Sequence, residues 1–322
     1  MKIRLTQIDG KLPNIALMKL SHFYKSTGHE VYFEPSVMRG IFEPEYDLVF
    51  GSAIFSDSQK KIFLFRDQFP NAIIGGTGSD NNMTVEKIIG QTQYENYDYG
   101  IYPDFLDSIG FTQRGCRLRC KFCVVPEKEG KVKPVNTLSD IWRGPSYPKN
   151  ILLLDNDFFG QSSWQQLCQE AIDNNFKVSF SQGINIRLIH QEGAEMLSRV
   201  KYYDSKFKNR RIYTAWDNKR DEEIFIRGIN YLLDSGIPSS HIMVYFLCNY
   251  WEQGLTPDIW YRFQKMIEIG VDPYPMVYNK PNAPQELKNF QRWVIRRNYR
   301  NIPFEEYNRS GREREKDLII YQ

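Results

Sequence analysis

Three cysteines lie within eight residues of this 322-residue chain, in the segment GFTQRGCRLRCKFCVVPEKEG. Cys116, Cys120 and Cys123 form a CxxxCxxC pattern, and the segment contains no fourth cysteine and no histidine. Cysteine thiolates hold iron-sulfur clusters, and a cubane cluster with three protein ligands keeps one iron open to bind a further molecule. The pattern therefore predicts a 4Fe-4S cluster that takes part in chemistry.

Other uses of these cysteines remain open at this point. A structural zinc site needs four ligands, and the histidines lie outside the segment, at His22, His29, His190 and His241. A disulfide framework is disfavoured, because five cysteines in 322 residues are sparse and odd in number. For Cys168 and Cys248 we expect core packing, since free cysteine is often buried.

The cysteine segment resembles the signature of the radical SAM enzymes, and Phe122, one residue before the third cysteine, also fits that pattern. The resemblance implies that Cys116, Cys120 and Cys123 are metal ligands and catalytic residues, and that the open iron chelates S-adenosylmethionine (SAM). It implies that reductive cleavage of SAM gives a 5'-deoxyadenosyl radical, which abstracts hydrogen from a substrate that the sequence does not identify. A low-potential electron donor such as flavodoxin or ferredoxin is then an expected partner.

From residue 101 onward, short β-rich apolar runs alternate with helical patterns, as in parallel α/β structures. Six runs are found, at 107–115, 151–157, 177–183, 211–217, 241–248 and 272–278. Helices are expected between them, for example at 163–175 and 221–236, where Gly236 and Pro238 provide a stop signal. The resemblance implies that residues 101–285 form a partial (β/α)6 TIM-like barrel, the radical SAM core.

Polar residues follow the second run, and the C-terminal ends of barrel strands are where active sites gather. Asp155, Asn156 and Asp157 can accept hydrogen bonds from the ammonium group of SAM, the role that the family gives to a motif at this place. Alternation along a strand predicts that Asp155 and Asp157 share one face and Asn156 the other. A helix cap or an Asx turn is the alternative for each of them.

The third run is followed by Gln182, Asn185 and Arg187. Amide groups suit the ribose hydroxyls of SAM, and a guanidinium suits its carboxylate. A surface ion pair is the alternative for Arg187. Further candidates for the rim follow the later runs, and they are Trp216, Asp217, Cys248, Asn249, Met276 and Tyr278.

The sequence pattern of residues 1–100 predicts a second α/β domain. Strands are expected at 2–9, 30–35, 46–55 and 71–78, and helices at 14–29 and 58–69. This order resembles the Rossmann-like, doubly wound cobalamin-binding domain that precedes the barrel in cobalamin-associated radical SAM proteins. The fold class expected for the chain is therefore α/β throughout.

The cobalamin-binding family carries a DxHxxG turn, an SxL segment and a GG turn. Here Asp9 is present, Lys11 occupies the histidine position and Asn14 the glycine position, while the other two motifs imply cofactor-binding roles for Ser52, Gly75 and Gly76. A protonated lysine has no lone pair with which to bind cobalt. Three alternatives stay open: cobalamin without a protein lower ligand, a different ligand, or a scaffold that binds nothing.

Residues 286–322 form a C-terminal extension rich in arginine and aromatic residues. This composition suits a phosphate-rich groove with Trp293 and Tyr299 as stacking surfaces, and it equally suits a helix packed under the barrel. A second functional hypothesis follows from it. In that hypothesis the chain is a non-catalytic iron-sulfur or zinc binding module that contacts nucleic acid through the extension.

The composition sets the broad class. The chain is long enough for about two domains, and 41% of its residues are hydrophobic. A net charge of +3 is too small to indicate a nucleic-acid binder by itself. Because no apolar run has the length of a membrane span and the first residues lack an export signal, we expect a cytoplasmic protein in a reducing compartment, without a membrane partner.

Overall fold

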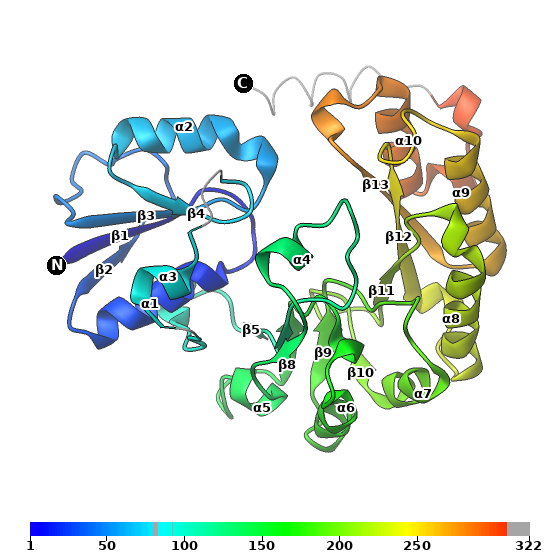
Figure 1. Ribbon diagram of the computed structural model, residues 1–322, viewed down its shortest axis with the longest axis horizontal. Helices are drawn as coiled ribbons and strands as arrows, with labels where there is room; N and C mark the ends of the chain where they lie inside the picture. Colours follow the sequence, from blue (N-terminus) through cyan, green and yellow to red (C-terminus); the bar gives the residue numbers. More distant parts are fainter. Residues whose placement is uncertain (80–82, 92, 308–322) are drawn as a thin grey trace. The chain divides into compact units, whose positions relative to one another are not determined.

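The computed structural model describes residues 1–79, 83–91 and 93–307 (Figure 1). The protein is a mixed α/β structure with sheets of parallel strands. Two compact units meet in the chain between Leu154 and Asp155. Within the described ranges, none of the helices combines the length and the apolar character that a membrane crossing requires.

The first unit begins with a four-stranded parallel sheet in the order β2-β1-β3-β4. Its strands are β1 (Lys2–Gln7), β2 (Glu30–Phe33), β3 (Leu48–Ser52) and β4 (Ile73–Gly75). In Figure 1 helix α2 (Gln59–Gln68) covers one face of this sheet, and α1 (Ile15–Ser26) and α3 (Val85–Ile89) cover the other. Strand β1 is therefore covered on both sides, and Ile3 and Leu5 are fully buried.

Helix α1 begins where the sequence provides a cap. The Asn14 Oδ1 atom accepts the Leu17 N–H at 3.2 Å, which satisfies one of the free donors of the first turn. The Nδ2 group of Asn14 donates to Ser52 Oγ at 2.8 Å. One buried side chain thus starts the helix and joins it to the end of β3.

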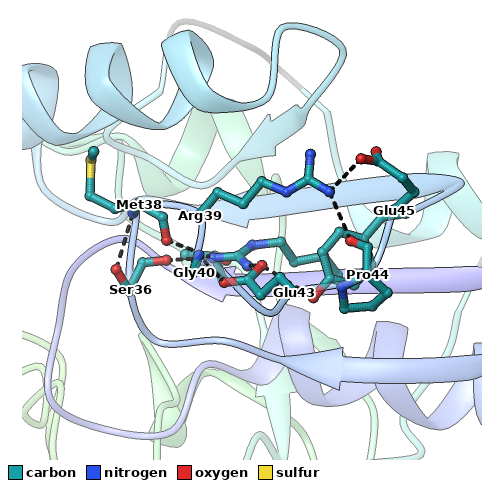
Figure 2. Close-up of polar contacts among 10 residues, drawn as sticks. Ser36, Met38, Arg39, Gly40, Glu43, Pro44 and Glu45 are labelled. Carbon is teal, nitrogen blue, oxygen red and sulfur yellow. Dashed lines mark hydrogen bonds and ion pairs between the residues drawn. The ribbon is translucent and has the colours of Figure 1, made fainter.

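The connection between β2 and β3 is held by polar contacts (Figure 2). Arg39 Nη2 pairs with Glu45 Oε1 at 2.7 Å within the loop. Arg4, which is buried in β1, donates to the Ser36 carbonyl at 2.6 Å and pairs with Glu43. Arg4 therefore connects the β2–β3 loop to β1, a central strand of the sheet.

The remainder of the first unit carries the cysteine segment. Strand β5 (Ser108–Gly110) pairs in parallel with β8 (Asn150–Leu153), and β6 (Gln113–Arg114) pairs in antiparallel fashion with β7 (Lys133–Pro134). Two short helices lie between these strands, α4 (Val125–Lys128) and α5 (Leu138–Ile141). Single 3-10 turns occur at Ser56–Ser58 and Tyr99–Ile101.

The second unit also consists of parallel strands and helices. Strand β9 (Lys177–Phe180) pairs with β10 (Lys201–Tyr202), and β11 (Ile212–Ala215), β12 (Ile242–Cys248) and β13 (Asp272–Val277) form a three-stranded sheet. Its helices are α6 (Trp164–Asp173), α7 (Gln191–Arg199), α8 (Glu222–Asp234), α9 (Pro257–Ile269) and α10 (Gln285–Ile295). Short 3-10 turns are Phe158–Gly160, Lys219–Asp221, Ser239–His241, Lys280–Asn282, Asn298–Arg300 and Phe304–Glu306.

Helices α8, α9 and α10 cover one face of the β11-β12-β13 sheet (Figure 1). Trp216, at the end of β11, stacks on Phe225 of α8 with ring centroids 4.5 Å apart. The opposite face carries Tyr213, Tyr245 and Tyr274, with neighbouring ring centroids 5.8 and 5.3 Å apart. One face of the β11-β12-β13 sheet is therefore packed against helices, and tyrosine side chains line the other face.

The predicted elements are present. All six runs after residue 101 contain a strand, the four N-terminal strands exist, and helices lie within or close to the ranges expected for α1, α2, α6 and α8. The sequence reasoning missed β7, β10, α3, α4 and α5, because elements of two to five residues are too short to show a periodicity.

The prediction for the C-terminal extension was wrong at one residue. Trp293 is only 5% exposed and donates its indole N–H to the Ile302 carbonyl at 2.8 Å, so it cannot stack on a base. Its ring packs against Trp260, Phe263 and Phe290. Residues 308–322 of the predicted extension lie outside the described residues.

Candidate functional site

The three cysteines lie on a loop that is closed at its base by β6 and β7. Arg114 stands opposite Lys133 in the two-stranded ladder, and the Cys116 N–H donates to the Gly130 carbonyl at 3.2 Å. Gly115, with φ +83, allows this closure, because a Cβ atom there would lie 2.2 Å from the Lys131 carbonyl oxygen. The cysteine loop, residues 115–132, is therefore a defined structural feature.

A salt bridge holds the two ends of the cysteine loop together. Arg114 donates Nε and Nη2 to the two carboxylate oxygens of Glu129, at 3.1 and 2.9 Å, and the Gly115 N–H donates to the same carboxylate at 3.0 Å. The Arg114 guanidinium also lies over the Phe111 ring, 4.3 Å from its centroid. Burial opposes ionisation of Glu129, but the hydrogen bonds and charge of Arg114 keep its pKa below the usual value.

The three thiols are similar in their exposure. Cys116, Cys120 and Cys123 are all partly buried, and none of the described cysteines forms a disulfide. The Cys123 N–H donates to the Cys120 carbonyl at 3.0 Å, and the Leu118 N–H lies 3.4 Å from Cys116 Sγ. Phe122, between the second and third cysteines, is also partly buried.

The cysteine loop also carries cationic side chains. Cys116 lies on a cavity of about 410 Å³ whose wall also includes Arg117, Arg119 and Lys131. These positive charges would offset the negative charge of thiolate ligands. The cavity wall thus combines a sulfur donor with counter-charges.

The donor set fits an iron-sulfur cluster, because three thiols on one short loop are the ligands that such clusters use. A zinc site of the structural type lacks its fourth ligand in the loop. Among the described residues, no three His, Cys, Asp or Glu side chains are already gathered tightly enough to hold a metal ion. Binding of one cluster by all three cysteines would therefore require their sulfur atoms to move together.

The acidic residues after β8 are buried in the alternation that the sequence predicts. Asp155 and Asp157 are 3% and 0% exposed, and Asn156 between them is partly exposed. Asp157 precedes the 3-10 turn Phe158–Gly160, but its side chain makes no capping hydrogen bond to that turn. The capping alternative therefore does not account for the burial of Asp157.

The residues after β9 differ from one another in their surroundings. Gln182 is exposed and Asn185 is partly buried. Arg187 pairs with Asp221 at 3.3 Å, with both side chains about 30% exposed or less, so the ion pair considered as an alternative is present. This pair brings the loop after β9 to the start of α8.

Asp217, directly after β11, has the most distinctive acid-base property of the second unit. Burial raises the pKa of its carboxyl to about 6, although Arg187 and Arg262 act in the opposite direction. Trp251 donates its indole N–H to the Asp217 carbonyl oxygen at 3.0 Å. A partly buried carboxyl with a raised pKa at the end of a strand is an acid-base candidate.

The rim positions proposed for Trp216 and Cys248 were wrong, because both side chains point into the core, and the core packing expected for Cys248 is confirmed. Trp216 is 1% exposed against α8, and Cys248 is 1% exposed and lies 3.5 Å from the Phe246 carbonyl. Burial raises the pKa of the Cys248 thiol to about 12. Asn249 instead shapes a turn at φ +66, where it binds the Gly254 N–H.

Sequence reasoning missed Arg262 of α9. This side chain is 2% exposed and donates to the carbonyl oxygens of Trp216 and Leu247 at 2.9 and 3.0 Å, while Asp258 balances its charge at 3.0 Å. It lies on a cavity of about 490 Å³ at the ends of β11 and β12. An arginine among the buried apolar positions of α9 is the sequence signal that could have found it.

A second crevice, of about 490 Å³, lies in the first unit at the C-terminal ends of β3 and β4. Its wall includes the predicted residues Ser52, Gly75 and Gly76. Lys11, at the position where the cobalamin family has its histidine, is exposed and does not belong to this wall. The carboxylate of Asp9 instead accepts the Ile54 and Phe55 N–H groups at 2.7 and 2.9 Å and braces the loop after β3.

Neither a protein-family model nor a curated protein matches this chain. Its functional interpretation therefore depends on the residues described above.

Proposed function

We propose that the chain is a radical SAM enzyme, in which Cys116, Cys120 and Cys123 bind a 4Fe-4S cluster. The observation that carries the proposal is a closed loop with three partly buried thiols and no fourth cysteine or histidine. A three-ligand cluster is suited to chemistry because one iron stays open. When bound, the cluster and SAM would supply the reductive cleavage that gives a 5'-deoxyadenosyl radical.

The chain's own residues would then bind and orient the cluster and SAM, and would exclude water from them. The cysteines are the ligands, and the bidentate Arg114–Glu129 pair holds the ends of their loop. Asp155 and Asp157 offer buried carboxylates for an ammonium group, and such charge-assisted hydrogen bonds are strong. Their burial also keeps competing water away.

The fold supports the same proposal. Parallel strands joined by helices are the units of a partial radical SAM barrel, and the strand order β2-β1-β3-β4, with helices on both faces, is expected of a Rossmann-like domain. Cobalamin-dependent methyl transfer is left out of the proposal. The exposed Lys11 provides no lower ligand for cobalt, and the reaction does not require it.

Anaerobic reconstitution with iron and sulfide tests the proposal. We expect about four irons per chain, and 5'-deoxyadenosine on addition of SAM and a strong reductant. The triple Cys116→Ala, Cys120→Ala, Cys123→Ala variant should lose both. Cys168→Ala is the matched control, because this buried cysteine lies on α6, outside the loop, and both signals should persist.

Two outcomes would favour the non-catalytic hypothesis instead. One is stoichiometric zinc without any capacity to form a cluster. The other is a stable cluster that releases no 5'-deoxyadenosine at any reductant concentration.

A further inference from the structure

The crevice in the first unit has an apolar interior between two parts of the chain. One wall comes from α1 and the ends of β3 and β4, and includes Leu20 and Phe50. The other comes from the segment around the cysteine loop, and includes Phe111 and Val135. Gly75 and Gly76 also line the crevice, and a Cβ atom at Gly76 would lie 2.1 Å from the Ala53 carbonyl oxygen, so two backbone segments approach closely there.

Charged side chains also line this crevice, and most of them are already paired. Lys19, 2% exposed, pairs with Glu95 at 2.7 Å and with Glu86 at 3.3 Å. Arg114 pairs with Glu129. The carboxylates in these pairs are therefore already neutralised by cations of the same wall.

Lys128 differs from these residues. Its ammonium donates to Thr77 Oγ1 at 2.9 Å, and among the described residues no carboxylate lies within 4.0 Å of it. The crevice wall holds three carboxylates, all engaged with Lys19 or Arg114, and two further lysines, Lys128 and Lys133. The wall therefore carries an excess positive charge at the side where Lys128 meets Thr77.

We propose that this crevice binds a small organic anion, a molecule with a ring-shaped apolar body and one phosphate or carboxylate group. The anionic group is held by the Lys128 ammonium and the Thr77 hydroxyl, and the ring lies between the apolar walls that include Leu20, Phe50, Phe111 and Val135. A volume of about 490 Å³ falls in the range of small-molecule sites and suits a mononucleotide or an aryl acid. The proposal does not depend on the radical SAM assignment, because it uses no cysteine and no iron.

Fluorescence titration with 8-anilinonaphthalene-1-sulfonate, a ring-bodied anion, tests the proposal on the full chain. We expect binding at one site, weakened about five- to tenfold by Lys128→Ala, since a charge-assisted hydrogen bond is lost at an exposed position. Lys128→Arg should restore most of the affinity. Lys121→Ala is the matched control, because this exposed lysine lies on the same loop but outside the crevice wall, and it should bind like the parent.

A neutral probe with a similar body, N-phenyl-1-naphthylamine, separates the charge from the apolar contact. Its affinity should be the same in the parent and in Lys128→Ala. The proposal is overturned if the sulfonate does not bind, if Lys128→Ala binds it as the parent does, or if Lys128→Ala weakens both probes equally.

Competition identifies the source of the anion. Displacement of the sulfonate probe by adenosine 5'-monophosphate indicates a phosphate ligand, and displacement by indole-3-acetate indicates a carboxylate ligand. Displacement by hydroxocobalamin alone, or by none of the three, would overturn the assignment to a small organic anion.

Discussion

Replacing Glu129 with alanine should loosen the cysteine loop. The Glu129 carboxylate accepts three hydrogen bonds, two from Arg114 and one from the Gly115 N–H. It is therefore the residue at which both ends of the loop are joined. Its removal leaves the Arg114 guanidinium partly buried beside Phe111 without its hydrogen-bonded carboxylate.

The loss of unfolding free energy in Glu129→Ala follows from the burial of the Arg114–Glu129 pair. The side chains of Arg114 and Glu129 are 23% and 12% exposed, so solvent screens their interaction only in part. Breaking a fully buried pair costs about 3–5 kcal/mol, and the partial exposure reduces this to about 2–3 kcal/mol. The Arg39–Glu45 pair of the same unit has exposures of 33% and 90%, so Glu45→Ala should cost below about 1 kcal/mol.

The assay is urea unfolding of cluster-free protein, followed by iron retention of the reconstituted protein in the presence of a chelator. Glu129→Ala should unfold at lower urea and lose iron faster, while Glu45→Ala should resemble the parent. The pKa of Glu129 is lowered on folding, so the stability that it provides is present above the unfolded pKa and is lost as the pH falls through the folded pKa. The difference between the parent and Glu129→Ala should therefore shrink below about pH 4.

Equal unfolding of the Glu129→Ala and Glu45→Ala variants at pH 7 would refute this reasoning. So would a Glu129→Ala deficit that stays constant down to pH 3, because the carboxylate would then not be the source of the stability. Glu129→Gln keeps the shape of the side chain and should fall between the parent and Glu129→Ala.

Three further predictions follow from buried groups of the second unit and from the cysteines. Folding raises the pKa of Asp217 to about 6, so the stability that its protonated carboxyl provides is complete near pH 3 and is lost as the pH rises through 6. In urea unfolding, Asp217→Asn should therefore be more stable than the parent by about 2 kcal/mol at pH 7 and equal to it near pH 3. Arg262→Ala should lower the free energy of unfolding by about 3 kcal/mol, because the substitution removes three hydrogen bonds and leaves two buried carbonyl groups unsatisfied. Lys265→Ala on the same helix should change the free energy of unfolding by less than about 0.5 kcal/mol. Iodoacetamide at pH 8 should modify the loop cysteines of the cluster-free protein but spare Cys168 and Cys248, because burial raises the pKa of both of these thiols to about 12. Peptide mass spectrometry that finds all five cysteines modified to the same extent would contradict this prediction.

The sequence by itself determined the local elements. Apolar periodicity predicted the principal strands and helices, and the alternating burial of Asp155, Asn156 and Asp157 followed from the two-residue repeat of an extended chain. The CxxxCxxC spacing also named the residues of the candidate cluster site. These properties depend on neighbours within a few residues, so they can be read along the chain.

The tertiary structure alone decided which side chains face the core and which distant charges meet. Trp216 was a candidate for the rim, and Cys248 was a rim candidate as well as an expected core residue, but the packing of helices α8 and α9 against the β11-β12-β13 sheet buries both. Lys19 meets Glu95 across 76 positions of sequence, and Arg262 reaches the carbonyl of Trp216 across 46. No local pattern encodes such pairs, because they form only when the order of the strands and the placement of the helices bring separate segments together.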